Sequence, residues 1–291
     1  MPKKRQAFLH VGLDDGSGDL VGPALLRHHS ALLELGVRHP AESSEETFHA
    51  ALELLRAHKA WGYKRKEVDG TWHRLLKRAA KGRDTVVVSQ PLLAAARPEQ
   101  VALTVDALHG FEVHVVVTVH APDAWTVPGD PARDLGSVLD RWSLGVRDPQ
   151  RLHVLVTDGD PVHTWKRLGR IAGFGTASLR LDDLPAPVKP RPPHQALPER
   201  AAVLDALGRS WVELLATSPY DVVGDTALLL PTLDAVEDPG KVVTATEHAL
   251  NDALVELERL TRRNESLELR VEKLEKKKRK LKRRLSEVDV A

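Results

Sequence analysis

Short runs of β-branched and other apolar residues alternate along this chain with stretches of helical periodicity. Four runs are nearly continuously apolar, as expected for strands that are buried on both faces of a parallel sheet. They are QAFLHVG (6–12), DTVVVS (84–89), EVHVVVTV (112–119) and RLHVLVTD (151–158), and GVRHPA (36–41) supplies a shorter fifth.

Apolar residues recur at helical spacing between these runs. The pattern predicts helices over residues 20–35, 48–55, 72–76, 98–108 and 162–174, and Pro98 stands in the first turn of the fourth. Strands that alternate with helices indicate right-handed βαβ units. We therefore predict an α/β fold with an open parallel sheet flanked by helices.

A proline-rich stretch interrupts this alternation. LPAPVKPRPPHQALP contains six prolines and is typical of a stiff connector. We predict an α/β domain over residues 1–183, a linker over 184–199, a helical segment over 200–240 that packs back on the domain, and a basic C-terminal coiled coil over 241–291.

The C-terminal segment carries an unbroken heptad repeat. Position a holds Leu250, Leu257, Asn264, Val271, Lys278 and Leu285, and position d holds Ala253, Leu260, Leu267, Leu274, Leu281 and Val288. Polar residues at a favour a two-stranded, in-register dimer. A single amphipathic helix folded against its own domain is the alternative. For the homodimer, the predicted contact residues are Leu250, Leu257, Leu260, Asn264, Leu267, Val271, Leu274 and Leu281.

Charge is unevenly distributed, although the formal net charge is +1. Residues 241–291 carry 14 Lys and Arg against 10 Asp and Glu, and the rest of the chain carries 28 against 31. The stretch KKKRKLKRR is suited to nucleic-acid backbone or an anionic membrane surface, with a solvated face as the alternative. Its basic residues are Lys276, Lys277, Lys278, Arg279, Lys280, Lys282, Arg283 and Arg284.

Composition narrows the remaining possibilities. The absence of cysteine excludes disulfides, thiolate metal sites and Cys nucleophiles, and no spacing among the 14 histidines matches a zinc site. No apolar run approaches the ~20 residues of a transmembrane helix, and nothing resembles a signal peptide, so we expect a cytoplasmic protein. The six Trp are expected to be core anchors. KAWGYKRKEVDGTWHR (59–74), which mixes aromatic and basic residues, is interpreted as a solvated helix and loop rather than a nucleic-acid contact.

The stretch FLHVGLDDGSGDL (8–20) is a strand that leads into a glycine-rich turn, with a predicted helix beyond it. That arrangement holds phosphate groups in many α/β proteins. Such a turn normally carries a Lys and hydroxyls, but this one carries Asp14, Asp15 and Asp19.

The order of several sequence blocks resembles the bacterial sulfotransferase family, which uses the sulfate donor PAPS on a P-loop-like α/β fold. The resemblance spans about residues 6–235, and it implies a P-loop-like sheet with PAPS as the cofactor if the ancestral activity survives. The blocks are FLHVG with its glycine-rich turn, ALLELGVRHP, FHAALEL, AAARPEQVALTVDAL, EVHVVVTV, LDRWSLGVRDPQRLHVL and SPYDVVGDTALLLP.

The chemical positions that this resemblance implies have changed. The family's loop reads approximately Gly-Thr-Pro-Lys-Thr-Gly-Thr-Thr; aligned from Gly12, Asp15 replaces the Lys and Asp19 the final hydroxyl. His120 stands where an Arg holds the donor's 3′-phosphate, and Gln90 and Pro91 replace a His-Glu pair. The degenerate donor site thus comprises Gly12, Asp15, Gly16, Ser17, Gly18, Asp19 and His120.

These substitutions predict a sulfotransferase-like protein that is non-catalytic and acts as a dimeric interaction or scaffold protein, and they identify no cofactor. Asp19 is then interpreted as a helix cap. Two alternatives remain open. One is an active PAPS-dependent sulfotransferase with a rebuilt site that draws charge from Lys64, Arg65 or Lys66. The other is a nucleic-acid-binding protein that works through residues 276–284.

Overall fold

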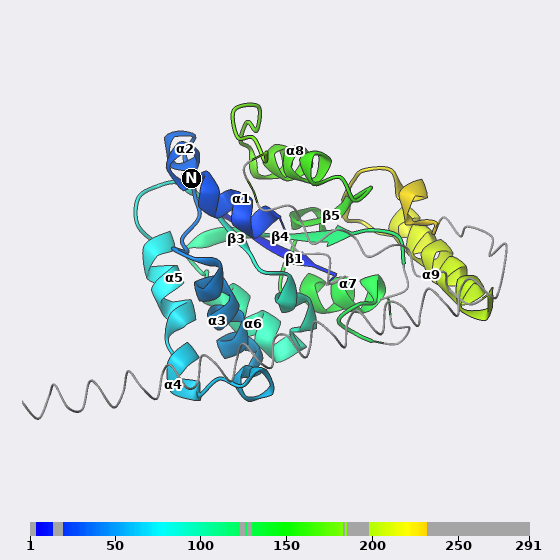
Figure 1. Ribbon diagram of the computed structural model, residues 1–291, viewed down its shortest axis with the longest axis horizontal. Coiled ribbons are helices and arrows are strands. Elements are labelled where there is room, and N and C mark those ends of the chain that lie inside the picture. Colours follow the sequence, from blue (N-terminus) through cyan, green and yellow to red (C-terminus); the bar gives the residue numbers. More distant parts are fainter. Residues whose placement is uncertain are drawn as a thin grey trace, which may run out of the picture. The chain divides into compact units, whose positions relative to one another are not determined.

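Six strands form one all-parallel sheet in the order β2-β3-β1-β4-β5-β6 (Figure 1). The α/β fold with an open parallel sheet, predicted from the alternating pattern, is therefore confirmed. The longest pairing joins β1 to β4, and Leu9 at its centre lies opposite Val88 on one side and Val115 on the other. The strands are β1 Arg5–Gly12, β2 Val37–Arg38, β3 Thr85–Ser89, β4 Phe111–Val119, β5 Leu152–Val156 and β6 Asp221–Val223.

The computed structural model describes residues 4–13, 20–122, 126, 130–182, 184 and 198–231. These residues belong to one unit, Met1–Leu233. Most of the predicted linker, the end of the segment 200–240 and the whole of 241–291 lie outside the described residues. The predicted dimer contacts, from Leu250 to Leu281, and the basic residues of 276–284 therefore lie outside them too.

Helices connect the strands on both faces of the sheet. The α-helices are α1 Val21–Arg27, α2 His29–Glu34, α3 Ser44–Leu55, α4 Arg65–Val68, α5 Thr71–Ala79, α6 Pro98–Asp106, α7 Leu135–Ser143, α8 Pro161–Ala172 and α9 Pro198–Thr217. Short 3₁₀ turns are η1 His58–Trp61, η2 Pro91–Ala95, η3 Pro149–Arg151 and η4 Thr226–Leu229.

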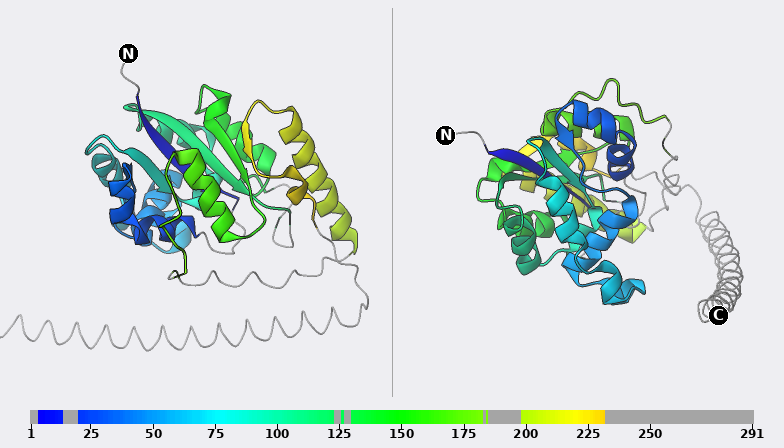
Figure 2. Two further views of the ribbon diagram at one scale, coloured as in Figure 1. Left: turned by 90° about the horizontal axis from the view of Figure 1, so that it is seen from above. Right: turned by 90° about the vertical axis from the view of Figure 1, so that its left-hand side faces the viewer.

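Each face of the sheet builds its own hydrophobic core. On one face α3, α5, α6, α7 and α9 pack against the side chains of Leu9, Val115 and Val154. On the other face α1, α2 and α8 cover Phe8, Val116 and Leu155 (Figures 1 and 2). Because successive side chains of a strand point to opposite faces, these nearly continuous apolar runs supply both cores.

Four elements differ from the sequence expectation, and the first is α7, a helix that was not among those predicted. The helix predicted over 20–35 is broken at His28, whose ring Nε2 lies 2.7 Å from the carbonyl oxygen of Arg180, so α1 and α2 are separate. Strand β6 was not predicted, because three residues are too few for a period to show. Helix α9, Pro198–Thr217, begins within the predicted linker, before the helical segment predicted over 200–240.

Four Trp residues are core anchors, as expected, and one is not. Trp72, Trp142, Trp165 and Trp211 are buried. Trp61 is 53% exposed. Trp125 lies outside the described residues.

Candidate functional site

A parallel sheet brings the carboxyl ends of all its strands to one edge. The chain leaves β1 towards β2 on one side and leaves β4 towards β5 on the other, so the neighbouring strands β1 and β4 form a topological switch point. Ligands of open α/β sheets bind outside the carboxyl ends at such a point. The residues that follow β1, β3, β4 and β5 therefore make up the candidate site.

The turn after β1 is described only at its start. Gly12 closes the strand, and the amide of Leu13 continues the ladder by donating to the carbonyl of Thr118 at 3.1 Å. A Cβ on Gly12 would lie 3.4 Å from Cβ of Pro91, so β1 ends in close contact with η2. Of the predicted donor loop, Asp15, Gly16, Ser17, Gly18 and Asp19 lie outside the described residues.

The two other predicted positions are held by local hydrogen bonds. His120 follows β4, and its ring Nδ1 donates to the carbonyl of the next residue, Ala121, at 2.6 Å. Gln90 follows β3 and is the N-cap of η2: its side-chain oxygen accepts from the amide of Leu92 at 3.3 Å. The amide of Gln90 also donates to the carbonyl of His10 at 3.0 Å. Both side chains thus serve the local backbone.

Sequence reasoning did not identify a polar group that is buried just inside this edge. His10 on β1 is 2% exposed, and its Nδ1 lies 2.8 Å from Oγ of Ser89 on β3 while its Nε2 lies 2.6 Å from Oγ1 of Thr118 on β4. The register that pairs these strands predicts the contact once the strand order is known. With both ring nitrogens hydrogen-bonded, His10 links the strands β1, β3 and β4.

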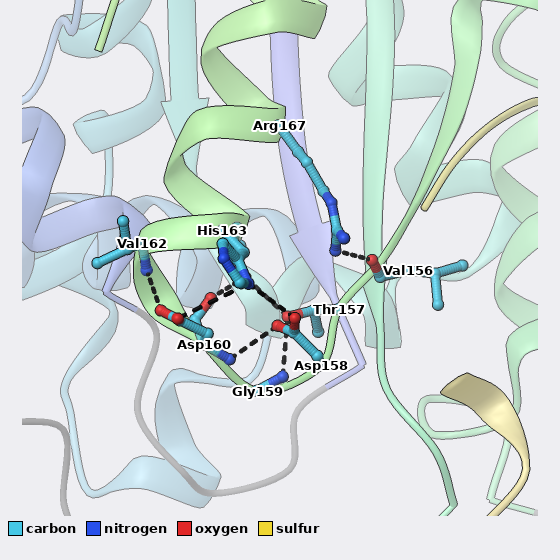
Figure 3. A network of polar contacts seen from close by, with 9 residues as sticks. Val156, Thr157, Asp158, Gly159, Asp160, Val162, His163 and Arg167 are labelled. Carbon is cyan, nitrogen blue, oxygen red and sulfur yellow. Dashed lines mark hydrogen bonds and ion pairs between the residues drawn. The ribbon is translucent and has the colours of Figure 1, made fainter. Parts of the chain in front are cut away.

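The turn between β5 and α8 carries the densest polar network of the described edge (Figure 3). Asp158 accepts from Nδ1 of His163 at 2.8 Å and from the amide of Asp160 at 3.0 Å. Asp160 caps α8 by accepting from the amide of Val162 at 2.7 Å, and Pro161 fills the first helical position. Gly159 has a φ of +84°, which closes the turn.

Asp158 and His163 form an acid–imidazole pair with defined roles. The hydrogen bond from His163 lowers the pKa of Asp158, so the carboxylate is ionised. The half-exposed His163 directs Nδ1 at Asp158, so Nε2 is the ring nitrogen that is not directed at this carboxylate. The sequence signal for this pair was the spacing of His163, which follows Asp158 by five residues and Asp160 by three.

Guanidinium groups near this edge bind the protein's own backbone. Arg141 on α7 donates to the carbonyls of Ala96 at 2.9 Å, Ala94 at 2.8 Å and Pro131 at 2.6 Å. Arg167 on α8 donates to the carbonyl of Val156 at 2.7 Å (Figure 3). These cations order the loops rather than point at the space beyond the strands.

A second unexpected polar chain crosses the sheet near its opposite edge. Nδ1 of His114 on β4 lies 2.9 Å from Nε2 of His153 on β5, and Nδ1 of His153 lies 2.6 Å from a carboxylate oxygen of Asp221 on β6. Glu112 lies 3.3 Å from Nε2 of His114. In the neutral form of His153, donation from Nδ1 to Asp221 leaves Nε2 as the nitrogen that accepts from Nδ1 of His114.

Comparison with protein-family models, curated proteins and solved structures finds no match to this chain. Within the described residues no group of three or more His, Asp or Glu side chains is arranged to hold a metal ion. Across that same part of the chain, no helix has the length and apolar character needed to span a membrane.

Proposed function

We propose that the chain is a sulfotransferase-like protein that no longer binds PAPS and that acts as a dimeric, non-catalytic interaction protein. The P-loop-like character of the fold is part of this proposal. Its support is a parallel sheet in which a glycine-rich sequence follows the central strand β1, at the switch point beside β4.

The observation that carries the proposal is the chemistry of the strand ends. The side chains of Gln90 and His120 are used by the neighbouring backbone, and the end of β5 presents the carboxylates of Asp158 and Asp160. An acyl, phosphoryl or sulfuryl donor with several negative charges needs fixed cations at this edge to stabilise the leaving group.

Electrostatics opposes donor binding here. Replacing a Lys by Asp15 changes the local charge by two units, and each unit charge a few Å from a phosphate is worth about 1–4 kcal/mol between bulk water and a protein surface. Asp158 adds an ionised carboxylate at the end of the same sheet edge. Backbone amides at a helix terminus contribute roughly 0.3–1 kcal/mol and do not offset this.

The heptads of residues 250–288 support the dimeric part of the proposal. Leu and Val at a and d give an apolar seam, and Asn264 sets the register of two strands. The basic residues of 276–284 are then doubled in the dimer, which suits an anionic partner. The seam and the basic run together favour an interaction role over a solitary enzyme.

Calorimetric titration with adenosine 3′,5′-bisphosphate, the desulfated donor, tests the proposal. The native chain is expected to show no binding up to millimolar nucleotide, and Asp15→Lys is expected to gain weak binding because it restores the missing cation. Asp69→Lys makes the same charge change at an exposed position and is the matched control. Micromolar binding by the native chain would restore the active-sulfotransferase alternative.

A further inference from the structure

Residues 56–66, between α3 and α5, form a strongly basic and exposed segment. Arg56, Lys59, Lys64, Arg65 and Lys66 are all exposed, and the sequence contains no Asp or Glu between positions 54 and 66. Within the described part of the chain, no ion pair joins any of these five side chains to another residue. Two exposed carboxylates, Glu67 and Asp69, follow the segment directly, and that of Glu67 accepts from the backbone amide of Lys64 rather than pairing with one of these cations.

An open indole lies inside this basic segment. Trp61 is 53% exposed, whereas Trp72, Trp142, Trp165 and Trp211 are buried. The ring of Trp61 meets that of Phe48 with centroids 5.2 Å apart and planes at 87°. A perpendicular contact with Phe48 covers at most one face of the indole, in keeping with the large exposed fraction of Trp61.

Specific side-chain and backbone contacts hold this segment in place. Phe48 also packs against Tyr63, with centroids 6.1 Å apart. The amides of Gly62 and Tyr63 donate to the carbonyls of Lys59 and His58 at 3.1 Å and 2.9 Å. These bonds close η1 directly after Trp61, its last residue. The indole therefore belongs to an ordered turn, η1, which contacts both α3 and α4.

The chain that leads from this segment into α5 is anchored as well. The carboxylate of Glu53 on α3 accepts from the amides of Gly70 and Trp72, each at 2.8 Å, and Val68 of α4 is buried. Lys64, Arg65 and Lys66 stand at consecutive positions at the start of α4. Lys64 is the N-cap with an extended backbone, and Arg65 and Lys66, the first two helical residues, point about 100° apart around the helix axis.

We propose that residues 56–66, the Trp61 surface, bind single-stranded nucleic acid: a base stacks on the open face of Trp61, and Lys59, Lys64, Arg65 and Lys66 contact the phosphates. An aromatic face among cations is the combination that binds single strands without reading their sequence. In a duplex the bases are already stacked on each other and offer no free face. This surface is formed by other residues than the basic run 276–284.

A membrane surface fits these observations less well. Insertion into lipid needs a broad apolar face, with several exposed large hydrophobic side chains. Here Trp61 is exposed, but Phe48 and Tyr63 are half-buried and Val68 is buried. One flat ring surrounded by charge matches a nucleobase better than it matches hydrocarbon.

Fluorescence anisotropy with a labelled oligothymidylate of about 20 nucleotides tests the inference. The protein is the full chain with the basic residues of 276–284 replaced by Gln, so that any binding comes from elsewhere. We expect salt-dependent binding that Trp61→Ala weakens about tenfold and Trp61→Phe weakens less than about threefold, as for one stacked base. Leu103→Ala, which truncates an exposed apolar side chain on α6, is the control and should leave binding unchanged.

The charges are tested in the same background. Lys64→Gln, Arg65→Gln and Lys66→Gln together should weaken binding and make its salt dependence shallower, by about 0.7 in log–log slope for each phosphate that the variant no longer neutralises. Arg147→Gln, Lys166→Gln and Arg170→Gln make the same charge change at exposed positions elsewhere and should leave the slope unchanged.

Three results would overturn the proposal. The first is no binding at low salt, and the second is an equal effect of Trp61→Ala and Leu103→Ala. The third is Trp61-dependent binding to anionic phospholipid vesicles without binding to the oligonucleotide. Trp fluorescence checks the contact independently of any effect of Trp61→Ala on folding. Addition of the oligonucleotide should quench the fluorescence of the protein that retains Trp61 and should not quench that of Trp61→Phe.

Discussion

Asp134 accepts more hydrogen bonds than a helix N-cap needs. One carboxylate oxygen accepts from the amide and hydroxyl of Ser137, at 2.9 Å and 2.6 Å, and the other accepts from the indole N–H of Trp211 on α9 at 3.1 Å. Burial opposes ionisation of Asp134, but these bonds and the charge of Arg141 outweigh it and lower its pKa. The side chain thus both starts α7 and fastens α9 to it.

Asp134→Ala is therefore predicted to destabilise the domain more than Asp160→Ala, which removes an ordinary exposed cap from α8. Loss of a cap costs about 1 kcal/mol, and leaving the indole of Trp211 without an acceptor adds about 1–3 kcal/mol. Urea denaturation of both variants measures the difference. Equal losses would show that the bond from Trp211 contributes nothing to stability.

At the scale of the elements, helix α9 packs closely against η4 at Gly208. A Cβ on Gly208 would lie 2.5 Å from the carbonyl oxygen of Leu229, closer than real Cβ atoms approach. A Cβ on Gly136, in α7, would meet its nearest neighbours at 3.6 Å, an ordinary contact distance. The two helical glycines therefore differ in what an added methyl group encounters.

Gly208→Ala is predicted to lower the free energy of unfolding by about 1–3 kcal/mol, because the helix must move away from Leu229. Gly136→Ala is predicted to raise it by about 0.4–1 kcal/mol, since Ala loses less backbone entropy in a helix. Thermal and urea melts give both values. If Gly208→Ala were neutral, the close packing of α9 on η4 would be contradicted.

The chain of His114, His153 and Asp221 predicts that stability falls on acidification. Burial lowers the pKa of His114; Glu112 opposes this shift, and the charges of His153 and Arg151 add to it. The unfolded chain then takes up a proton on His114 near its ordinary pKa of about 6.5 while the folded domain does not. Stability is lost as the pH falls from that value to the lowered pKa, and this contribution is constant outside the window.

Free energies of unfolding between about pH 7.5 and 5.5 check this. The native chain should lose stability more steeply than His114→Gln, in which the titrating ring is replaced by an amide. His109→Gln removes an exposed histidine and controls for the loss of one imidazole. Parallel curves for the native chain and His114→Gln would contradict the prediction that His114 makes the free energy of unfolding depend on pH.

The sequence predicted the parts of the fold that depend on local pattern. Continuous apolar runs such as VVV within β3 give buried strands, and Pro98 marks the start of α6. The break at His28 was missed because the apolar period continues across it, and β6 because its three residues are recognisable only beside β5. Tertiary pairing, rather than local preference, decides these elements.

Much of the candidate site could not be predicted for a similar reason. The pairs His10–Ser89 and His114–His153 join residues far apart in sequence, and only the strand order brings them together. The capping of α8 by Asp160 is, by contrast, a local contact between residues close in sequence, the kind of feature that a sequence can indicate. The exposure of Trp61 was not foreseen, since composition indicates only that Trp residues are usually buried.

At the scale of the whole molecule, the heptads predict self-association. Sedimentation equilibrium of the full chain should give a dimer at micromolar concentration, and Leu260→Ser, Leu267→Ser and Leu274→Ser together should give a monomer because they empty the apolar seam. Glu265→Ser, Glu272→Ser and Lys273→Ser change positions outside the seam and should remain dimeric. A monomeric native chain would favour a terminal helix that folds back on its own domain.

The carboxyl edge of the sheet is where the central claim, loss of the sulfate donor site, is tested most directly. A crystal structure of the protein soaked with millimolar adenosine 3′,5′-bisphosphate would show whether that edge still accepts the nucleotide. The account predicts no nucleotide density beyond the ends of β1 and β4. A nucleotide seated with its 5′-phosphate on the turn after Gly12 would contradict it.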